Sequence, residues 1–268
     1  MKKTLVFATI LAFISIARAT NEISYSSCKR QFNDQASSME VLNCFISVFE
    51  SSKDVVIKID SARYITSICG RDNKNKRCSF KQSIDVFNMI KEDTKVPLYY
   101  EAKYYAALAY YNLGVRERKT AHLDQALQYV DDVEKHKDQL IDTTSLLMNL
   151  TRANIYIAKA DVQDNYNYYL DAIHYLENAE KDANQKYKIA IERMMFNAKK
   201  GYADQVVKKC DEKNDDLACE KCEIVRTIYK ELIDKKKYLN VSAALKADIK
   251  LGYHKAKCVK KTPNQPKL

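Results

Sequence analysis

The feature that most constrains the fold is an internal repeat with an offset of 46 residues. Residues 124–135 (DQALQYVDDVEK) align with residues 170–181 (LDAIHYLENAEK), with identical residues at four positions and conservative matches at three more. The same offset aligns Tyr110 with Tyr156. Repeated helix pairs that cannot bury their apolar faces alone are typical of a solenoid, in which neighbouring pairs stack.

Apolar residues recur at helical spacing through nearly the whole chain after residue 39. Ile224, Ile228 and Leu232, for example, follow one another at intervals of four. No long stretch alternates with period two, and only 4 Gly and 3 Pro occur in 268 residues, which disfavours turn-rich β-sandwiches and barrels. The sequence therefore predicts an all-α protein of eight to ten helices, with one of the breaks near Gly201.

Residues 107–184 resemble tetratricopeptide (TPR) units, because small and aromatic residues stand where that family has them. The family's large aromatic residue, its Leu-Gly pair and its Ala fall on Tyr110, Leu113, Gly114 and Ala126. Small residues let paired helices approach closely, and the aromatic ring fills the space beside them. The resemblance implies a TPR-like right-handed superhelix of antiparallel helix pairs.

The sequence also departs from the TPR pattern. Glu117 stands in place of a usual aromatic residue and Ala121 in place of the turn Gly, and the second unit has Lys159-Ala160 where Leu-Gly would stand. The offset of 46 residues exceeds the usual 34 of the family. This difference predicts an insertion of about 12 residues in the connection 139–152.

The TPR resemblance further implies a concave groove that holds another protein or a peptide. Chaperone-binding members clamp a carboxylate with a Lys and an Asn, but those positions are Tyr111 and Val115 here, so that ligand is not expected. The residues that would line the groove are Leu108, Tyr111, Arg118 and Lys119 in the first unit, and Asn154, Ile157, Asp161 and Asp164 in the second.

The N-terminus has the layout of a secretory signal. Lys2 and Lys3 precede an apolar run over residues 4–16, and Ala17 and Ala19 then predict cleavage after Ala19. The alternative, a membrane anchor, is disfavoured because about 20 apolar residues are needed to span a bilayer. The mature chain is expected to be secreted or to remain in the lumen of the secretory pathway, or in the periplasm if the source is bacterial.

Eight cysteines follow this signal in two groups of four, on either side of a Cys-free stretch from 79 to 209. They predict up to four disulfides, paired within each group, with three connectivities per group left open. A CxxC spacing (219–222) also occurs in zinc and redox sites, but no second matching pair and no βαβ context accompanies it. The cysteines are Cys28, Cys44, Cys69, Cys78, Cys210, Cys219, Cys222 and Cys258.

These features divide the chain into segments, with disulfides that staple the helical array at both ends. The expected segments are a signal peptide (1–19), a disulfide-bonded helical segment (20–96), a TPR-like array (97–210), a basic helical hairpin cap (211–258) and a flexible tail (259–268).

The C-terminal region is strongly basic, with eleven Lys against three acidic residues over 229–268. Lys246, Lys250 and Lys257 share one predicted helix face, which either binds an anionic lipid or acidic partner or is simply solvated. Residues 219–258 also resemble the first half of a saposin-like lipid-binding domain, which opens with CxxC and an apolar helix. The second half of such a domain and its cysteines are missing.

The sequence has no pattern typical of catalysis: HExxH, GxSxG and P-loop motifs are absent. We therefore expect a protein that is not an enzyme and uses no cofactor or metal. Six tyrosines within 99–111 could stack on single-stranded nucleic acid, but export makes nucleic acid an unexpected partner. Asn149 and Asn240 begin N-glycosylation sequons.

Overall fold

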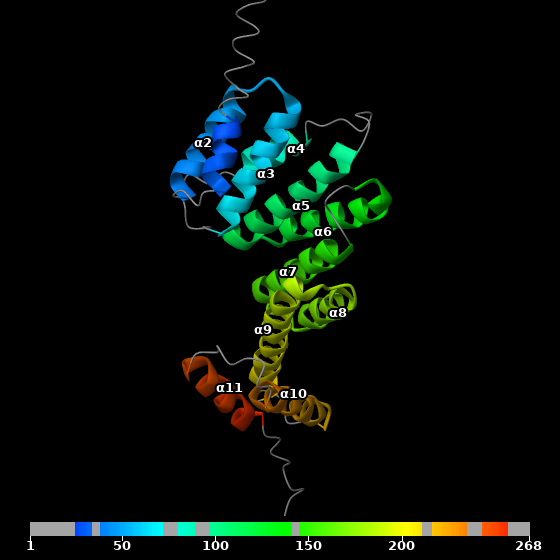
Figure 1. Cartoon of the computed structure of the whole chain (residues 1–268). Coiled ribbons are helices and arrows are strands. Elements are labelled where there is room, and N and C mark those ends of the chain that lie inside the picture. Colours follow the sequence, from blue (N-terminus) through cyan, green and yellow to red (C-terminus); the bar gives the residue numbers. More distant parts are fainter. Residues whose placement is uncertain are drawn as a thin grey trace, which may run out of the picture. The chain divides into compact units, whose positions relative to one another are not determined.

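The computed structural model describes residues 25–33, 38–71, 80–88, 97–140, 145–210, 216–234 and 243–256. These residues are helical apart from short turns, which confirms the predicted all-α class, and the helices pack in sequential antiparallel pairs (Figure 1). About 11 helices occur in the described residues, slightly more than predicted. The chain divides into two compact units, Met1–Thr143 and Thr144–Leu268, so the predicted array 97–210 includes helices of both.

The described part of the first unit starts with the helical residues 25–33 and continues with helices α2 to α6, each of which packs on the next (Figure 1). In addition, α3 touches α5. These helices are α2 (Ser38–Ser51), α3 (Val55–Arg71), α4 (Phe80–Asn88), α5 (Pro97–Glu117) and α6 (Thr120–Glu134), followed by the short 3-10 helix η1 (Lys137–Gln139).

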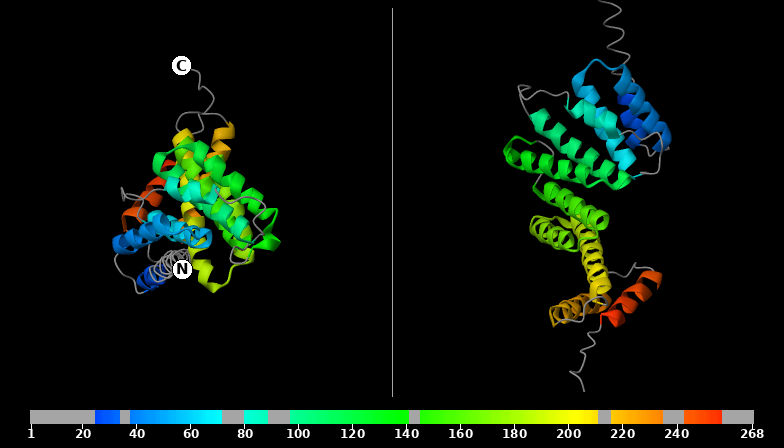
Figure 2. Two further views of the ribbon diagram at one scale, coloured as in Figure 1. Left: turned by 90° about the horizontal axis from the view of Figure 1, so that it is seen from above. Right: turned by 180° about the vertical axis from the view of Figure 1, so that it is seen from behind.

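Over its described residues, the second unit contains five helices, and again each packs on the next. Figure 2 shows α10 and α11 beside the C-terminal end of α9, on which both pack. The helices are α7 (Ser145–Gln163), α8 (Asn167–Lys181), α9 (Gln185–Cys210), α10 (Asp216–Asp234) and α11 (Ala243–Lys255).

Each unit has its own hydrophobic cluster. In the first unit Leu42, Phe45 and Phe80 are fully buried, and they belong to one cluster that α2, α3, α4 and α5 share. In the second, Leu176 and Tyr229 belong to a separate cluster that reaches from α7 to α11. Burial of apolar side chains, more than intrinsic helix propensity, stabilises helices of this length.

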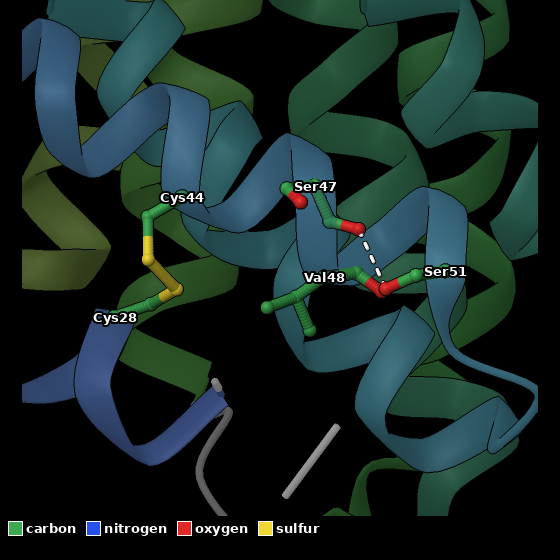
Figure 3. Close-up of a disulfide and its surroundings, with 5 residues drawn as sticks. All are labelled: Cys28, Cys44, Ser47, Val48 and Ser51. Atoms are coloured by element: carbon green, nitrogen blue, oxygen red, sulfur yellow. Dashed lines mark hydrogen bonds between the residues drawn. A yellow bond between two sulfur atoms is a disulfide. The ribbon is translucent and has the colours of Figure 1, made fainter. Parts of the chain in front are cut away.

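The disulfide between Cys28 and Cys44 ties residues 25–33 to α2 (Figure 3). The two Cα atoms lie 5.6 Å apart, within the usual range for a disulfide. This pair lies within the first cysteine group, as predicted, and Cys69 and Cys222 are also disulfide-bonded. Cys78 and Cys258 lie outside the described residues, as do the side chains of Cys210 and Cys219.

The predicted helix break near Gly201 is wrong, because α9 runs without interruption from Gln185 to Cys210. The glycine serves close packing instead. A Cβ atom at this position would lie 2.3 Å from Cζ of the buried Tyr169 ring on α8, well inside van der Waals contact. The absence of a side chain at Gly201 therefore lets the Tyr169 ring lie against the backbone of α9.

The connection 139–152 is shorter than an insertion of about 12 residues would make it. Residues 145–152 already belong to α7, where Leu146 and Met148 are buried. The additional residues of this connection therefore extend the helix, because buried apolar side chains continue its packed face toward the N-terminus.

The hairpin α5–α6 is held by an aromatic stack and a close helix approach. Tyr110 stacks on Tyr129 with a centroid distance of 5.6 Å, and its other ring neighbour is His122 at 6.1 Å. Gly114 lies against Leu123, to which a Cβ would approach within 2.7 Å. Tyr110 and Gly114 are two of the residues that the TPR resemblance assigns to packing positions, and each packs against α6.

The hairpin α7–α8 contains the equivalent ring contacts 46 residues later. Tyr156 stacks on Tyr175 with a centroid distance of 5.6 Å and on Tyr168 at 6.1 Å. Lys159 replaces the Leu of the TPR pattern; it is buried, and its ammonium lies 4.7 Å from the Tyr168 ring centroid. The ring faces stabilise the cation, so a lysine can occupy this packing position.

Both hairpins also turn in the same way. Arg118 follows α5 with a φ of 52°, and Asp164 follows α7 with a φ of 50°. The next amide donates back into the helix in each case, Lys119 to the Gly114 carbonyl at 3.0 Å and Asn165 to the Ala160 carbonyl at 3.3 Å. This arrangement is a Schellman motif, which satisfies helix-terminal carbonyl groups.

Several predictions fall on residues that the structure does not describe: the signal peptide 1–19, the tail 259–268, Lys257 and Asn240. Among the described helices, none is long and apolar enough to cross a membrane.

Candidate functional site

Two of the predicted groove residues, Leu108 and Tyr111, line a pocket in the first unit. Both are half-buried on α5. The pocket has a volume of about 590 Å³, and its other walls come from α3 and from Phe32 in the helical residues 25–33. Ligand pockets in proteins typically measure about 300–1,000 Å³, so this pocket is of a size that can hold a small ligand or a side chain of a partner.

Aromatic rings form much of the pocket wall and are fixed by ring contacts. Tyr64 on α3 stacks on Phe45 with a centroid distance of 4.4 Å and an interplanar angle of 7°, and Phe32 meets Tyr64 edge-on at 4.9 Å. Phe45 is completely buried, so the stacked pair anchors Tyr64 to the core. The wall is therefore held in place before any ligand binds.

Arg63 supplies the positive charge of this pocket. Its guanidinium lies 4.9 Å from the Tyr64 ring centroid and 5.7 Å from that of Tyr105, and it forms a 2.5 Å ion pair with Asp60. Burial lowers the pKa of Arg63, but the hydrogen bond with Tyr105 and the charge of Asp60 outweigh this effect and leave the pKa raised. Asp60 also accepts a hydrogen bond from the Tyr25 hydroxyl.

Two hydrogen-bonding groups of the pocket residues have no partner among the residues that the structure describes. One is the hydroxyl of Thr66, whose residue is only 3% exposed, and the other is Nε of Arg63. Most buried polar groups in proteins are hydrogen-bonded, so such groups require an explanation. No sequence pattern predicts either residue as part of a site, since neither belongs to a motif and α3 lies outside the TPR-like region.

The other two groove residues of the first unit, Arg118 and Lys119, lie on the exposed turn between α5 and α6. Lys119 forms a 2.8 Å ion pair with Glu117. This hydrogen bond, with a further contribution from His122, lowers the pKa of Glu117. Neither Arg118 nor Lys119 lines the pocket.

The predicted groove residues of the second unit lie along α7 and its C-terminal end. Asn154 and Ile157 are half-buried, whereas Asp161 and Asp164 are exposed. Asp161 accepts a hydrogen bond from the hydroxyl of Tyr169. Their spacing of three and four residues places Asn154, Ile157 and Asp161 on one face of the helix.

The basic face lies on α11, where Lys246 and Lys250 are both exposed. The helix packs through the neighbouring Ile249, which is 3% exposed. Asp248 lies between these two lysines in sequence, and it forms a 2.7 Å ion pair with Lys200 on α9.

The sequon at Asn149 lies within α7. Asn149 is half-buried, and the buried Thr151 donates its hydroxyl to the Leu147 carbonyl at 2.8 Å. Across the described part of the chain, no group of three or more His, Cys, Asp or Glu side chains is placed to hold a metal ion.

No protein-family model matches the chain, and neither a curated protein nor a solved structure matches it. The chain is therefore characterised by its architecture: an all-helical protein of about 11 helices, counted over the described residues, that pack in sequential antiparallel pairs.

Proposed function

We propose that the protein is an exported, non-enzymatic binding module built from TPR-like helix pairs. Its partner would be another protein or a peptide, held against the face of α5 that carries Leu108 and Tyr111. The observation that carries the proposal is the common construction of the hairpins α5–α6 and α7–α8, which share ring stacks and helix ends at an offset of 46 residues.

This common construction supports a repeat architecture. The stacked pairs Tyr110–Tyr129 and Tyr156–Tyr175 each have a centroid distance of 5.6 Å, and the two helix ends differ by only 2° in φ. Helix pairs repeated in this way form solenoids, and TPR-like solenoids wind into a right-handed superhelix, which we propose here as well. Solenoids commonly bind their partners along extended concave faces.

Of the two helix faces that carry predicted groove residues, that of α5 is a better candidate for partner binding than that of α7, because it contains a pocket. Leu108 and Tyr111 line the 590 Å³ pocket, and their side chains are half-buried without belonging to the fully buried core. Aromatic residues in preformed depressions are the usual anchors of protein interfaces. We propose that Asn154, Ile157, Asp161 and Asp164 on α7 supply an equivalent face in the second unit.

A capture experiment with a double variant tests this proposal. The mature chain, purified from a secretory host with its disulfides intact, is immobilised and exposed to secreted proteins of the same source. Tyr111→Ala combined with Arg118→Asn should reduce capture of the specific partner roughly tenfold or more. Asparagine is chosen at Arg118 because it tolerates the positive φ that this turn requires.

The matched control is Gln128→Ala combined with Lys135→Ala. Both side chains are exposed and belong to α6 or its end, away from the pocket. Partners that bind the proposed face should be retained by this control. If every captured partner stays bound to the Tyr111→Ala/Arg118→Asn variant, the proposal is wrong.

The second candidate is binding to lipid or an anionic membrane surface through α10 and α11. The exposed Lys246 and Lys250 favour it, together with the exposed Leu251 and Ile224, since such surfaces combine basic and apolar groups. Co-sedimentation with anionic vesicles at low salt should then depend on Lys246 and Lys250. Absence of binding to such vesicles would exclude this function.

A further inference from the structure

We infer that the pocket between α3 and α5 is a binding site for a small aromatic carboxylate. The inference rests on the pocket of the first unit alone and is independent of partner capture, so it can fail or hold whatever the outcome of that experiment. Size, wall chemistry and hydrogen-bonding groups each point to this class of ligand.

The walls of the pocket favour a ligand with an apolar, planar ring system. Phe32, Tyr64, Tyr105 and Tyr111 contribute aromatic rings, and Leu108 adds an aliphatic side chain. Rings bind rings by stacking or edge-on contact, as Tyr64 already does with Phe45 and Phe32. The volume of about 590 Å³ leaves room for a ligand with two fused rings.

The polar groups of the pocket favour a ligand that carries a hydrogen-bond acceptor, and they favour an anionic acceptor. The Thr66 hydroxyl and Arg63 Nε both lack a partner in the described part of the chain, and both residues line the pocket. A guanidinium has five N–H donors, so Arg63 can bind a ligand while it keeps its contacts with Asp60 and Tyr105. A carboxylate forms charge-assisted hydrogen bonds with such a donor, and these are stronger than neutral ones.

A bound ligand would explain why the Thr66 hydroxyl is buried without a hydrogen-bond partner among the described residues. Because a hydroxyl buried without a partner loses the hydrogen bonds that water would provide, it destabilises the empty protein. A carboxylate oxygen in the pocket would accept a hydrogen bond from the Thr66 hydroxyl and so supply the partner that it lacks. The same oxygen, or its neighbour, would accept from Arg63 Nε.

Calorimetric titration with 2-naphthaleneacetate tests the inference, with 2-(2-naphthyl)ethanol as the matched neutral probe. The acid should bind once per chain with a Kd on the order of 100 µM. The alcohol should bind at least about tenfold more weakly, since it cannot form the charge-assisted bond. Failure of the acid to bind at millimolar concentration would overturn the proposal, as would equal affinities for acid and alcohol.

Variants on α3 provide the second test. Thr66→Val keeps the shape of the side chain and should weaken binding of the acid about 5- to 15-fold. Arg63→Gln should weaken binding of the acid at least about tenfold and leave the affinity for the alcohol unchanged. Ser61→Ala is the matched control, because Ser61 on the same helix is also buried, has no hydrogen-bond partner among the described residues and does not line the pocket.

Ser61→Ala should bind the acid as the unmodified protein does. Thermal unfolding of each variant establishes that it is folded, and the near-isosteric Thr66→Val keeps the test interpretable if Arg63→Gln fails to fold. If Thr66→Val and Ser61→Ala bind the acid equally well, the pocket does not use the Thr66 hydroxyl and the inference is wrong.

Discussion

At the scale of single residues, three of the four glycines lie where a neighbouring side chain occupies the place of a Cβ atom. A Cβ would approach Leu123 at Gly114, Tyr169 at Gly201 and Tyr229 at Gly252 to between 2.3 and 2.7 Å. All three contacts are made by buried side chains of an adjacent helix. The glycines therefore set how closely paired helices approach, although they are poor helix formers.

We predict that Gly201→Ala destabilises the protein by about 1–3 kcal/mol. Alanine improves helix propensity by about 1 kcal/mol, but its methyl group would displace the Tyr169 ring and with it the hydrogen bond to Asp161. Chemical unfolding measures the change. Gly70→Ala is the control, because its nearest contact is the amide of Asn112 at 3.0 Å and should cost little; equal losses in both variants would contradict the packing argument.

Two buried tyrosines predict a loss of stability in alkali. Burial raises the pKa of Tyr169 and of Tyr229, and hydrogen bonds to Asp161 and Asp204 raise them further. The unfolded chain releases these protons near pH 10, whereas the folded chain keeps them to higher pH. Their contribution to stability is therefore complete below pH 10 and declines above it.

The free energy of unfolding should fall by roughly 2–3 kcal/mol between pH 9 and pH 11, since each of the two tyrosines contributes about 1.4 kcal/mol per pH unit above its unfolded pKa. Tyr169→Phe or Tyr229→Phe should reduce this slope, as measured by urea unfolding at each pH. Tyr187→Phe, which changes a half-buried tyrosine near the exposed start of α9, is the control. A slope unchanged in both buried-site variants would contradict the prediction.

At the scale of the element, the helix ends after α5 and α7 contain non-glycine residues with positive φ. Such a conformation is unfavourable for residues with a Cβ atom, and glycine removes that cost. We predict that Arg118→Gly raises the free energy of unfolding by about 0.5–1 kcal/mol. Lys135→Gly is the control: Lys135 ends α6 with a φ of −61°, so glycine should there be neutral or destabilising. Destabilisation by Arg118→Gly would refute the argument.

Helix pairing was largely predictable from sequence because apolar spacing directly reflects the buried face of each helix. Ala126 and Ala172, aligned by the repeat, are both fully buried, as are Val130 and Leu176. The errors came from residues with two roles. Glycine often ends a helix, but Gly201 instead allows close packing of α8 on α9. Leu146 and Met148 lie in the predicted connection 139–152, but both are buried and belong to α7.

At the scale of the whole molecule, each of the two units has a separate hydrophobic cluster. We predict two unfolding transitions, each responding to changes in its own unit. Replacing Cys28 and Cys44 together by serine should lower the stability of the first unit by roughly 3 kcal/mol, since the disulfide closes a loop of 16 residues. Calorimetry should show the second transition unchanged; a uniform shift of a single transition would contradict the prediction.

The candidate site was only partly predictable. Leu108 and Tyr111 could be identified because the TPR register places them on an inner helix face. Arg63 and Thr66 could not, because nothing in a single helical segment indicates that a hydroxyl will be buried without a hydrogen-bond partner. That property depends on where α3 lies relative to α5 and Phe32, which local spacing does not specify.

The paired tyrosine stacks also have an optical consequence. The chain contains 19 Tyr and no Trp, so its near-ultraviolet circular dichroism comes mainly from tyrosine rings held in fixed environments. Rings stacked at 5.6 Å with interplanar angles of 24° and 10° couple electronically, one stack in each unit. Each hairpin thus has a built-in chromophore, and a single tryptophan introduced into either unit would provide a fluorescence signal without background from others.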